Sequence, residues 1–323
     1  MLKKRMAGGR MISALLCAAV FCGLAGCTDL ADKSADEEKR MDDTAIEAAS
    51  VPEENNSASA PDEGASDEES VVYVSIGDSI AHGYGLSDIR DDAYSSVVAD
   101  MFAADGIKCE AENYGVDGQK SDGLISYIGS NASLQSDLTG ADYVSISIGA
   151  NNILGTALQF VNDYNDFKTN PKTAFTSEII TEKFKQFNSD TDRGLEALRS
   201  DIPTLIETIR SYNEDCEIIF LACYNPYGAV RVTMDWGGLM TYDFSVLSDT
   251  CVTRMDDIIR EMSEECGYSV ADVYGAFSGR EDKLVNASPV SDTESFSGGI
   301  DPHPNKNGHS VIAGVIYDMI GKK

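Results

Sequence analysis

The chain has 323 residues, with 25 Lys and Arg against 54 Asp and Glu, a formal net charge of −29 and a pI near 4.2. This balance argues against a nucleic-acid partner, because phosphate binding requires clustered Lys and Arg. It also disfavours direct docking on anionic lipid or wall polymer.

Residues 1–26 have the pattern of a secretory signal peptide. Four basic residues are followed by an apolar run over 11–24, which is too short for a permanent membrane span. The run ends in Leu24-Ala25-Gly26-Cys27, which resembles the bacterial lipobox. The resemblance implies that Cys27 is acylated, with palmitate as a typical chain, and becomes the first residue of a lipoprotein. We therefore expect a lipid anchor at the outer face of the bacterial cell membrane.

After the lipidated Cys, residues 27–70 are dominated by Asp, Glu, Ala, Ser and Asn. Such a segment buries too little apolar surface to offset its conformational entropy, so we expect a disordered acidic tether. Repulsion between its charges keeps it extended. The remaining residues, 71–323, are about 250 in number and fit one domain.

In residues 71–323, short Val- and Ile-rich runs alternate with longer amphipathic segments, which is typical of a parallel sheet with helices on both faces. Strands are predicted at 71–76, 107–112, 141–148, 217–223 and 268–273. Helices are predicted at 93–104, 192–212, 246–266 and 306–320. The continuous apolarity of the first strand indicates burial on both of its faces.

Residues 153–190 show little strand character and form an insertion after the third strand. They are rich in aromatic side chains, namely Phe160, Tyr164, Phe167, Phe175, Phe184 and Phe187. Aromatic residues at helical spacing usually face a core, which favours helical padding at the rim of the sheet. The alternative is a cap over a binding cleft that offers aromatic contacts to a substrate.

Eight Cys residues are present, two of them in the signal peptide and a third, Cys27, assigned to the lipid. The other five contain no close-spaced Cys-x-x-Cys pair of the kind that binds metals. An odd number leaves at least one thiol unpaired. Cys109, Cys216 and Cys223 lie in or beside apolar runs and are expected to be small buried thiols.

Polar segments follow three of the predicted strands and precede the last helix. They are Gly77-Asp78-Ser79-Ile80, Asn113 to Gly118, Gly149-Ala150-Asn151-Asn152 and Asp301-Pro302-His303-Pro304-Asn305. Open α/β sheets bind ligands at the carboxyl ends of their strands. A Ser hydroxyl needs a base to become a nucleophile, and a tetrahedral intermediate needs hydrogen-bond donors for its oxyanion. These segments contain both kinds of group.

The four segments, in this order, resemble those of the SGNH (GDSL-type) hydrolase family, named for its Ser, Gly, Asn and His. The resemblance covers nearly all of residues 71–323 and implies a flavodoxin-like three-layer α/β/α sandwich with a central parallel sheet. It implies Ser79 as nucleophile and His303 as general base. It also implies an oxyanion hole made by the Ser79 N–H, the Gly115 N–H and the Asn151 side chain. No metal or organic cofactor is implied.

Two positions depart from the family pattern. Asn152 stands where the family usually has Asp, so the family pattern does not predict which hydrogen bonds its side chain makes. The orienting acid usually lies three residues before the His, where this chain has Ile300, and Asp301 is therefore the candidate. Should Asp301 fail to reach the imidazole, a Ser-His pair with a backbone acceptor would remain. His309 is expected to pack within the last helix and not to act as the base.

The predicted function is cleavage of carboxylic esters through an acyl-enzyme by a monomeric surface esterase. A carbohydrate O-acetyl ester and a lysophospholipid or other lipid ester fit equally well as substrates. The Gly-x-Ser-x-Gly elbow of the α/β-hydrolases is not matched, because residue 81 is Ala. Two alternatives stay open, since fold does not guarantee function. One is a non-catalytic glycan- or lipid-binding lipoprotein, and the other is an acyltransferase that uses the same residues.

Overall fold

The computed structural model describes residues 70–169, 176–230, 233–238, 241–287 and 301–321. The predicted signal peptide, Cys27 and the tether up to residue 69 lie outside them. Ser70, the last residue of the predicted tether, already belongs to the first strand. Within the described ranges, no helix is both long enough and apolar enough to span a bilayer.

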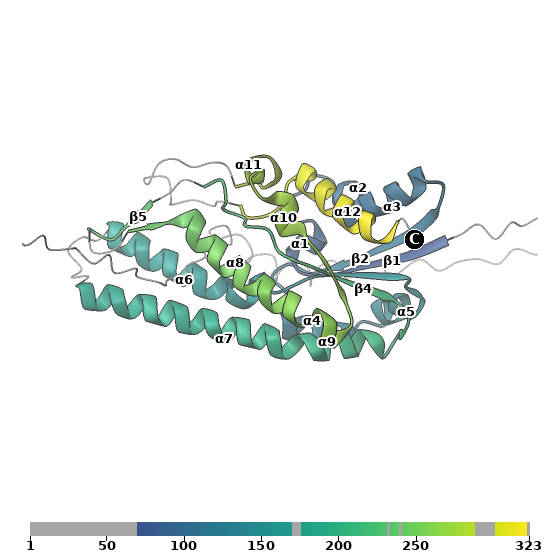
Figure 1. Cartoon of the computed structure of the whole chain (residues 1–323), viewed down its shortest axis with the longest axis horizontal. Coiled ribbons are helices and arrows are strands. Elements are labelled where there is room, and N and C mark those ends of the chain that lie inside the picture. The colour runs from purple at the N-terminus through teal and green to yellow at the C-terminus, as the bar shows by residue number, and fades with distance from the viewer. Residues whose placement is uncertain (1–69, 170–175, 231–232, 239–240, 288–300, 322–323) are drawn as a thin grey trace, which may run out of the picture.

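Five parallel strands form the central sheet in the order β2-β1-β3-β4-β7 (Figure 1). All five match predicted strands in order and type, with ends that differ by up to three residues. Their bounds are Ser70–Gly77 for β1, Lys108–Gly115 for β2, Tyr143–Ser147 for β3, Glu217–Leu221 for β4 and Ser269–Ala271 for β7.

Position in the sheet explains the composition of each strand. The central strands β1, β3 and β4 are largely buried, because helices cover both faces of the sheet. Strand β2 lies at the edge and exposes Lys108, Glu110 and Glu112. Charged side chains along an exposed edge oppose pairing with another chain.

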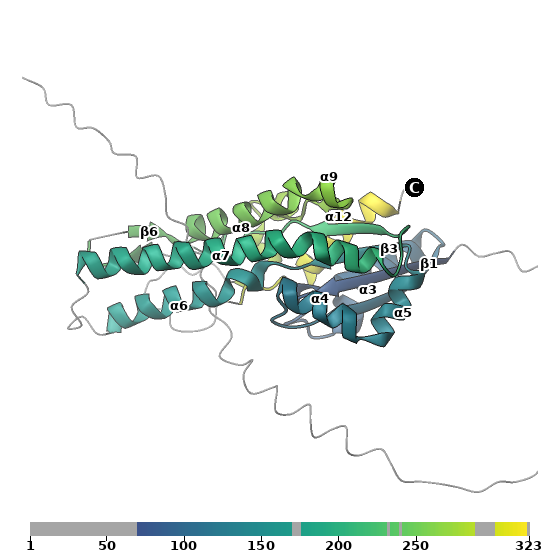
Figure 2. The same cartoon turned by 90° about the horizontal axis from the view of Figure 1, so that it is seen from below.

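Helices pack on both faces of the sheet (Figures 1 and 2), which confirms the expected α/β/α sandwich. One face carries the helices α2 (Ile89–Asp92), α3 (Tyr94–Ala104), α10 (Val273–Phe277), α11 (Glu281–Leu284) and α12 (Lys306–Ile320). The other carries α4 (Ser121–Ser130), α5 (Ala132–Gly140), α8 (Phe244–Glu261), α9 (Ser263–Cys266) and the C-terminal half of α7 (Ser177–Arg210). The short α1 (Ser79–His82) follows β1 directly.

A helical extension projects beyond the sheet (Figures 1 and 2). It consists of α6 (Ala150–Thr169), the N-terminal half of α7, which packs along α6, and the hairpin of β5 (Thr233–Asp235) and β6 (Thr241–Asp243). The rings of Phe160, Tyr164, Phe184 and Phe187 are at most 4% exposed and lie around Trp236 or one another.

Apart from the N-cap residue Thr176, the described residues of 153–190 lie in the helices α6 and α7. Their four buried rings fill the core of the extension and do not present their faces to a substrate. The alternative of an aromatic cap over a cleft is not supported by these four side chains. Phe175 lies outside the described residues.

The five Cys residues of the folded domain are free thiols. Cys216 is buried, as expected, whereas Cys109 and Cys223 are only partly buried and pack against the core. Burial raises the pKa of the Cys223 thiol well above its ordinary value. A thiol with a raised pKa is a poor nucleophile, which fits a packing role.

Candidate active site

The order of the strands reverses at β1, which has β2 on one side and β3 on the other. This is the topological switch point at which open α/β sheets bind ligands. The chain leaves β1 through Gly77, whose φ is 138°. A Cβ on this residue would overlap the carbonyl of Ser147 on β3, so the close approach requires glycine.

Asp78 fixes the start of α1. Its carboxylate caps the helix by accepting the Ile80 N–H at 3.0 Å, and it also accepts the Ser147 hydroxyl at 3.2 Å. Asp78 is 1% exposed, and this burial raises the pKa of its carboxyl to about 6 even though both hydrogen bonds lower it. The cap places Ser79 in the first turn of α1, at the switch point.

Ser79, His303 and Asp301 form a chain of hydrogen bonds. The Nε2 atom of His303 lies 2.9 Å from the Ser79 Oγ, and its Nδ1 atom lies 2.6 Å from the Asp301 Oδ1. With the proton on Nδ1, Nε2 can accept the Ser79 proton; this tautomer is assigned from the hydrogen bonds. The arrangement can activate a Ser hydroxyl for attack on a carbonyl carbon.

Although Asp301 lies only two residues before His303 in the sequence, its carboxylate reaches the imidazole. Oδ1 of Asp301 also accepts the backbone N–H of His303 at 3.0 Å, so the carboxylate folds back over Pro302. Burial raises the pKa of Asp301, but the hydrogen bonds from His303 and Asn286 outweigh it and leave the pKa below its ordinary value. Asp301 therefore stays ionised and can stabilise an imidazolium, so a backbone acceptor is not needed.

Two of the expected oxyanion donors are available. The Ser79 N–H has no acceptor among the described residues. Asn151, 7% exposed in the first turn of α6, donates one amide hydrogen to the Gln119 carbonyl at 3.0 Å. Its second amide hydrogen is left for a ligand, while the first holds the loop after β2 against α6.

Gly115 does not fit the expected donor role. Its N–H already donates to the Asn113 Oδ1 at 2.9 Å, and a Cβ on Gly115 would overlap the backbone of His82. Gly115 is therefore required for the close packing of β2 on α1. The next glycine of the loop, Gly118, has a φ of 75° and an N–H without an acceptor in the described ranges. A second glycine three residues further along was the sequence signal for this alternative.

Asn152 and His309 both make contacts that stabilise the fold. Asn152 accepts the Ser121 N–H at 3.2 Å and donates to the Ser121 hydroxyl at 2.7 Å, which joins α6 to α4. His309 is fully buried in α12, and its Nδ1 accepts the Tyr94 N–H at 3.2 Å. Burial lowers the pKa of His309 to about 4, so it stays neutral and packs, as expected.

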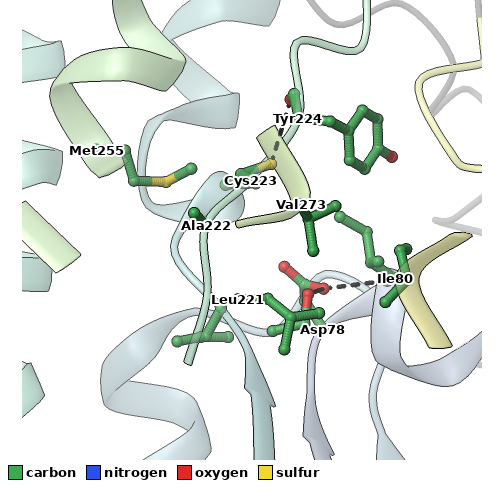
Figure 3. Close-up of a pocket in the computed structure, with 12 residues that line it drawn as sticks. Asp78, Ile80, Leu221, Ala222, Cys223, Tyr224, Met255 and Val273 are labelled. Carbon is green, nitrogen blue, oxygen red and sulfur yellow. Dashed lines mark hydrogen bonds between the residues drawn. The ribbon is translucent and has the colours of Figure 1, made fainter. Parts of the chain in front are cut away.

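A small cavity lies beside the nucleophile turn (Figure 3). Asp78 and Ile80 line it from one side, and Cys223 and Tyr224, which follow β4, line it from another. Its remaining walls are mostly apolar, and it has room for about one water molecule.

Comparison with known proteins identifies the family. Residues 75–311 match the model of the GDSL-like lipase/acylhydrolase family. The uncharacterized protein YpmR of Bacillus subtilis (strain 168) is 25% identical over 260 residues, which are 79% of this chain and 83% of that protein.

Two solved structures share the fold. The extracellular lipase of Streptomyces rimosus aligns over 77% of this chain and 99% of its own, with a TM-score of 0.52 and 16% identity. The lipase Lip_vut3 from a goat rumen metagenome aligns over 77% and 96%, with a TM-score of 0.51 and 14% identity. Because the family match covers more than half of the chain and includes all four polar segments, this chain belongs to the GDSL-like lipase/acylhydrolase family of hydrolases.

Proposed function

We propose that the protein is a serine esterase that hydrolyses carboxylic esters through an acyl-enzyme. The hydrogen-bonded chain of Ser79, His303 and Asp301 is the observation that supports this reaction. The Ser79 Oγ attacks the ester carbonyl carbon while its proton passes to the His303 Nε2, and Asp301 stabilises the resulting imidazolium. His303 then gives this proton to the leaving alkoxide.

Deacylation uses the same groups. His303 takes a proton from a water molecule, and the resulting hydroxide attacks the acyl carbon. The bond between this carbon and the Ser79 Oγ then breaks, His303 returns the proton to Oγ, and the carboxylic acid is released. The negative charge that forms on the carbonyl oxygen in both steps needs donors in fixed positions. The Ser79 N–H and the Asn151 amide would supply two of them, and the unengaged Gly118 N–H is the better candidate than Gly115 for a third.

The substrate is proposed to be an ester of a small molecule, a polysaccharide or a lipid at the cell surface. A sugar O-acetyl ester and a lysophospholipid remain the two leading classes. Anchoring through an acylated Cys27 alone is part of the same proposal, supported by the lipobox-like sequence. Metabolic labelling with an alkyne palmitate, lost in Cys27→Ala, is the test for the anchor.

The test of the reaction uses residues 28–323 with a fluorophosphonate probe and p-nitrophenyl esters from acetate to long acyl chains. We expect labelling and turnover that both disappear in Ser79→Ala. The chain-length profile, together with acetylated sugars and lysophospholipids as substrates, identifies the acyl group. Acyl transfer to an added sugar in place of water would indicate an acyltransferase. A folded protein that neither labels nor turns over any ester would support a binding lipoprotein instead.

A further inference from the structure

A short strand-like contact holds the loop that carries His303. Residues 283–287 run antiparallel to 301–305, with the Asn286 N–H donating to the His303 carbonyl at 2.9 Å and the Asn305 N–H to the Leu284 carbonyl at 2.9 Å. On the other side, the Tyr224 hydroxyl donates to the Pro302 carbonyl at 2.7 Å. The backbone of the loop is therefore fixed from two directions.

The side chain of Asn286 makes a different contact, directly to the acid of the triad. Its Nδ2 donates to the Asp301 Oδ2 at 3.0 Å. The other oxygen, Oδ1, accepts both the ring and the backbone N–H of His303. The Asn286 amide is the only donor to Oδ2 among the described residues, so it holds the second oxygen of the carboxylate while His303 holds the first.

The turn after the nucleophile helix packs on this contact. The ring of Tyr84 lies 4.5 Å from the ring of His303 between centroids. Gly85 follows with a φ of 86°, and a Cβ there would lie 3.3 Å from the Asn286 Nδ2 and 3.4 Å from the Asp301 Oδ2. A side chain at Gly85 would thus press on both partners of the hydrogen bond.

We propose that Asn286 is a positioning residue of the triad, which holds the Asp301 carboxylate so that Oδ1 faces the His303 imidazole. The inference rests on the proposed esterase function. A purely structural role is carried by the backbone N–H of Asn286, which any substitution except Pro retains. The side-chain amide can therefore be removed while the contact between residues 283–287 and 301–305 is kept.

Asn286→Ala tests the role in catalysis. Because a hydrogen bond to a charged group is lost, we expect kcat to fall by about 10- to 100-fold with KM unchanged. Asn286→Asp keeps the shape but puts a second carboxylate beside Asp301, where two charges this close are not both tolerated. We expect a larger loss than in Asn286→Ala at pH 8, and a smaller difference near pH 5, where a protonated Asp can again donate to Oδ2.

A spectroscopic signal tests the same role without turnover. The chain has three His residues, so the low-field proton resonance of the hydrogen bond between His303 and Asp301 can be assigned by its loss in His303→Gln. We expect this resonance to move upfield and broaden in Asn286→Ala. A protein without ester turnover would refute the proposed function, and the resonance would still report on positioning.

Asn305→Ala is the matched control on the same pair of segments. It removes side-chain hydrogen bonds to the Lys283 carbonyl at 2.9 Å and from the Gly308 N–H at 3.1 Å, but neither touches the triad. We expect a lower Tm with the low-field resonance retained. The proposal is overturned if Asn286→Ala behaves like this control, with a lower Tm but an unchanged resonance and kcat.

Discussion

The catalytic edge of the sheet and the helical extension are held together in different ways. At the edge, buried or half-buried polar groups make hydrogen bonds to specific partners, as in the contacts of Asp78, Asp301 and Asn151. In the extension, aromatic rings pack around Trp236. Hydrogen bonds fix angles and distances, whereas apolar packing is non-directional and scales with buried area. Changes at the edge should therefore alter rate, and changes in the extension should alter stability.

The largest effect is expected for Asp301→Asn. An amide cannot stabilise the imidazolium and favours the wrong tautomer of His303, so we expect kcat to fall by about 10⁴-fold with little change in Tm. Steady-state kinetics with active-site titration measure this loss. The control is Asp192→Asn, which removes a surface ion pair with Arg254 and should leave kcat near wild type. Activity within tenfold of wild type in Asp301→Asn would return the Ser-His pair to consideration.

Phe160→Ala tests the other side of the comparison. The ring is 2% exposed and lies 4.7 Å from Phe184 and 5.7 Å from Trp236 between centroids. Its removal should lower the free energy of unfolding by about 3–5 kcal/mol, with kcat per folded molecule unchanged. Chemical denaturation measures the loss, and Val246→Ala, at a site 60% exposed, is the control. A raised KM at unchanged stability would instead show that the extension contacts the substrate.

Asn151→Ala should lower kcat by a smaller factor than Asp301→Asn, and it also removes the hydrogen bond to the Gln119 carbonyl. Loss of one oxyanion donor costs kcat about 10²- to 10³-fold, which is about 3 kcal/mol of transition-state stabilisation. Asn152→Ala, next in the chain, loses two hydrogen bonds to Ser121 and should mainly lower Tm. Equal kcat values for the two variants, measured on the same p-nitrophenyl ester, would remove Asn151 from the oxyanion hole.

Asp78→Asn tests whether the edge maintains its geometry at a cost in stability. The pKa of Asp78 rises on folding from 3.8 to about 6, so the folded state binds more protons between these pH values, and wild-type stability falls as pH rises through them. An Asn at this position keeps the oxygen that accepts the Ile80 N–H and the Ser147 hydroxyl, but it carries no charge. Between pH 4 and pH 7, the variant should gain at most about 3 kcal/mol relative to wild type. A pH-independent difference in the free energy of unfolding would contradict this.

The sequence alone was sufficient for the sheet and for the approximate site. The central strands β1, β3 and β4 were predictable because strands buried on both faces must be continuously apolar. The edge strands β2 and β7 were found from their place in the alternation of strands and helices. Ser79, Asn151 and His303 were predictable because each follows a strand or precedes a helix at the edge where parallel strands end together. By contrast, α4 and α5, over 121–140, were not predicted, and α7 begins 15 residues before the predicted start at Asp192.

Only the tertiary structure decided how the polar groups pair. The reach of Asp301 to His303 depends on a carboxylate folded over Pro302, and the Asn286 contact joins residues 15 apart across an antiparallel bridge. The Asn113 side chain accepts the Gly115 N–H, which leaves Gly118 as the better oxyanion donor of the two loop glycines. Burial of the aromatic residues in the extension required the packing of α6, α7 and the hairpin. Local patterns report burial and chain direction, whereas hydrogen-bond partners follow from three-dimensional distances that no local pattern contains.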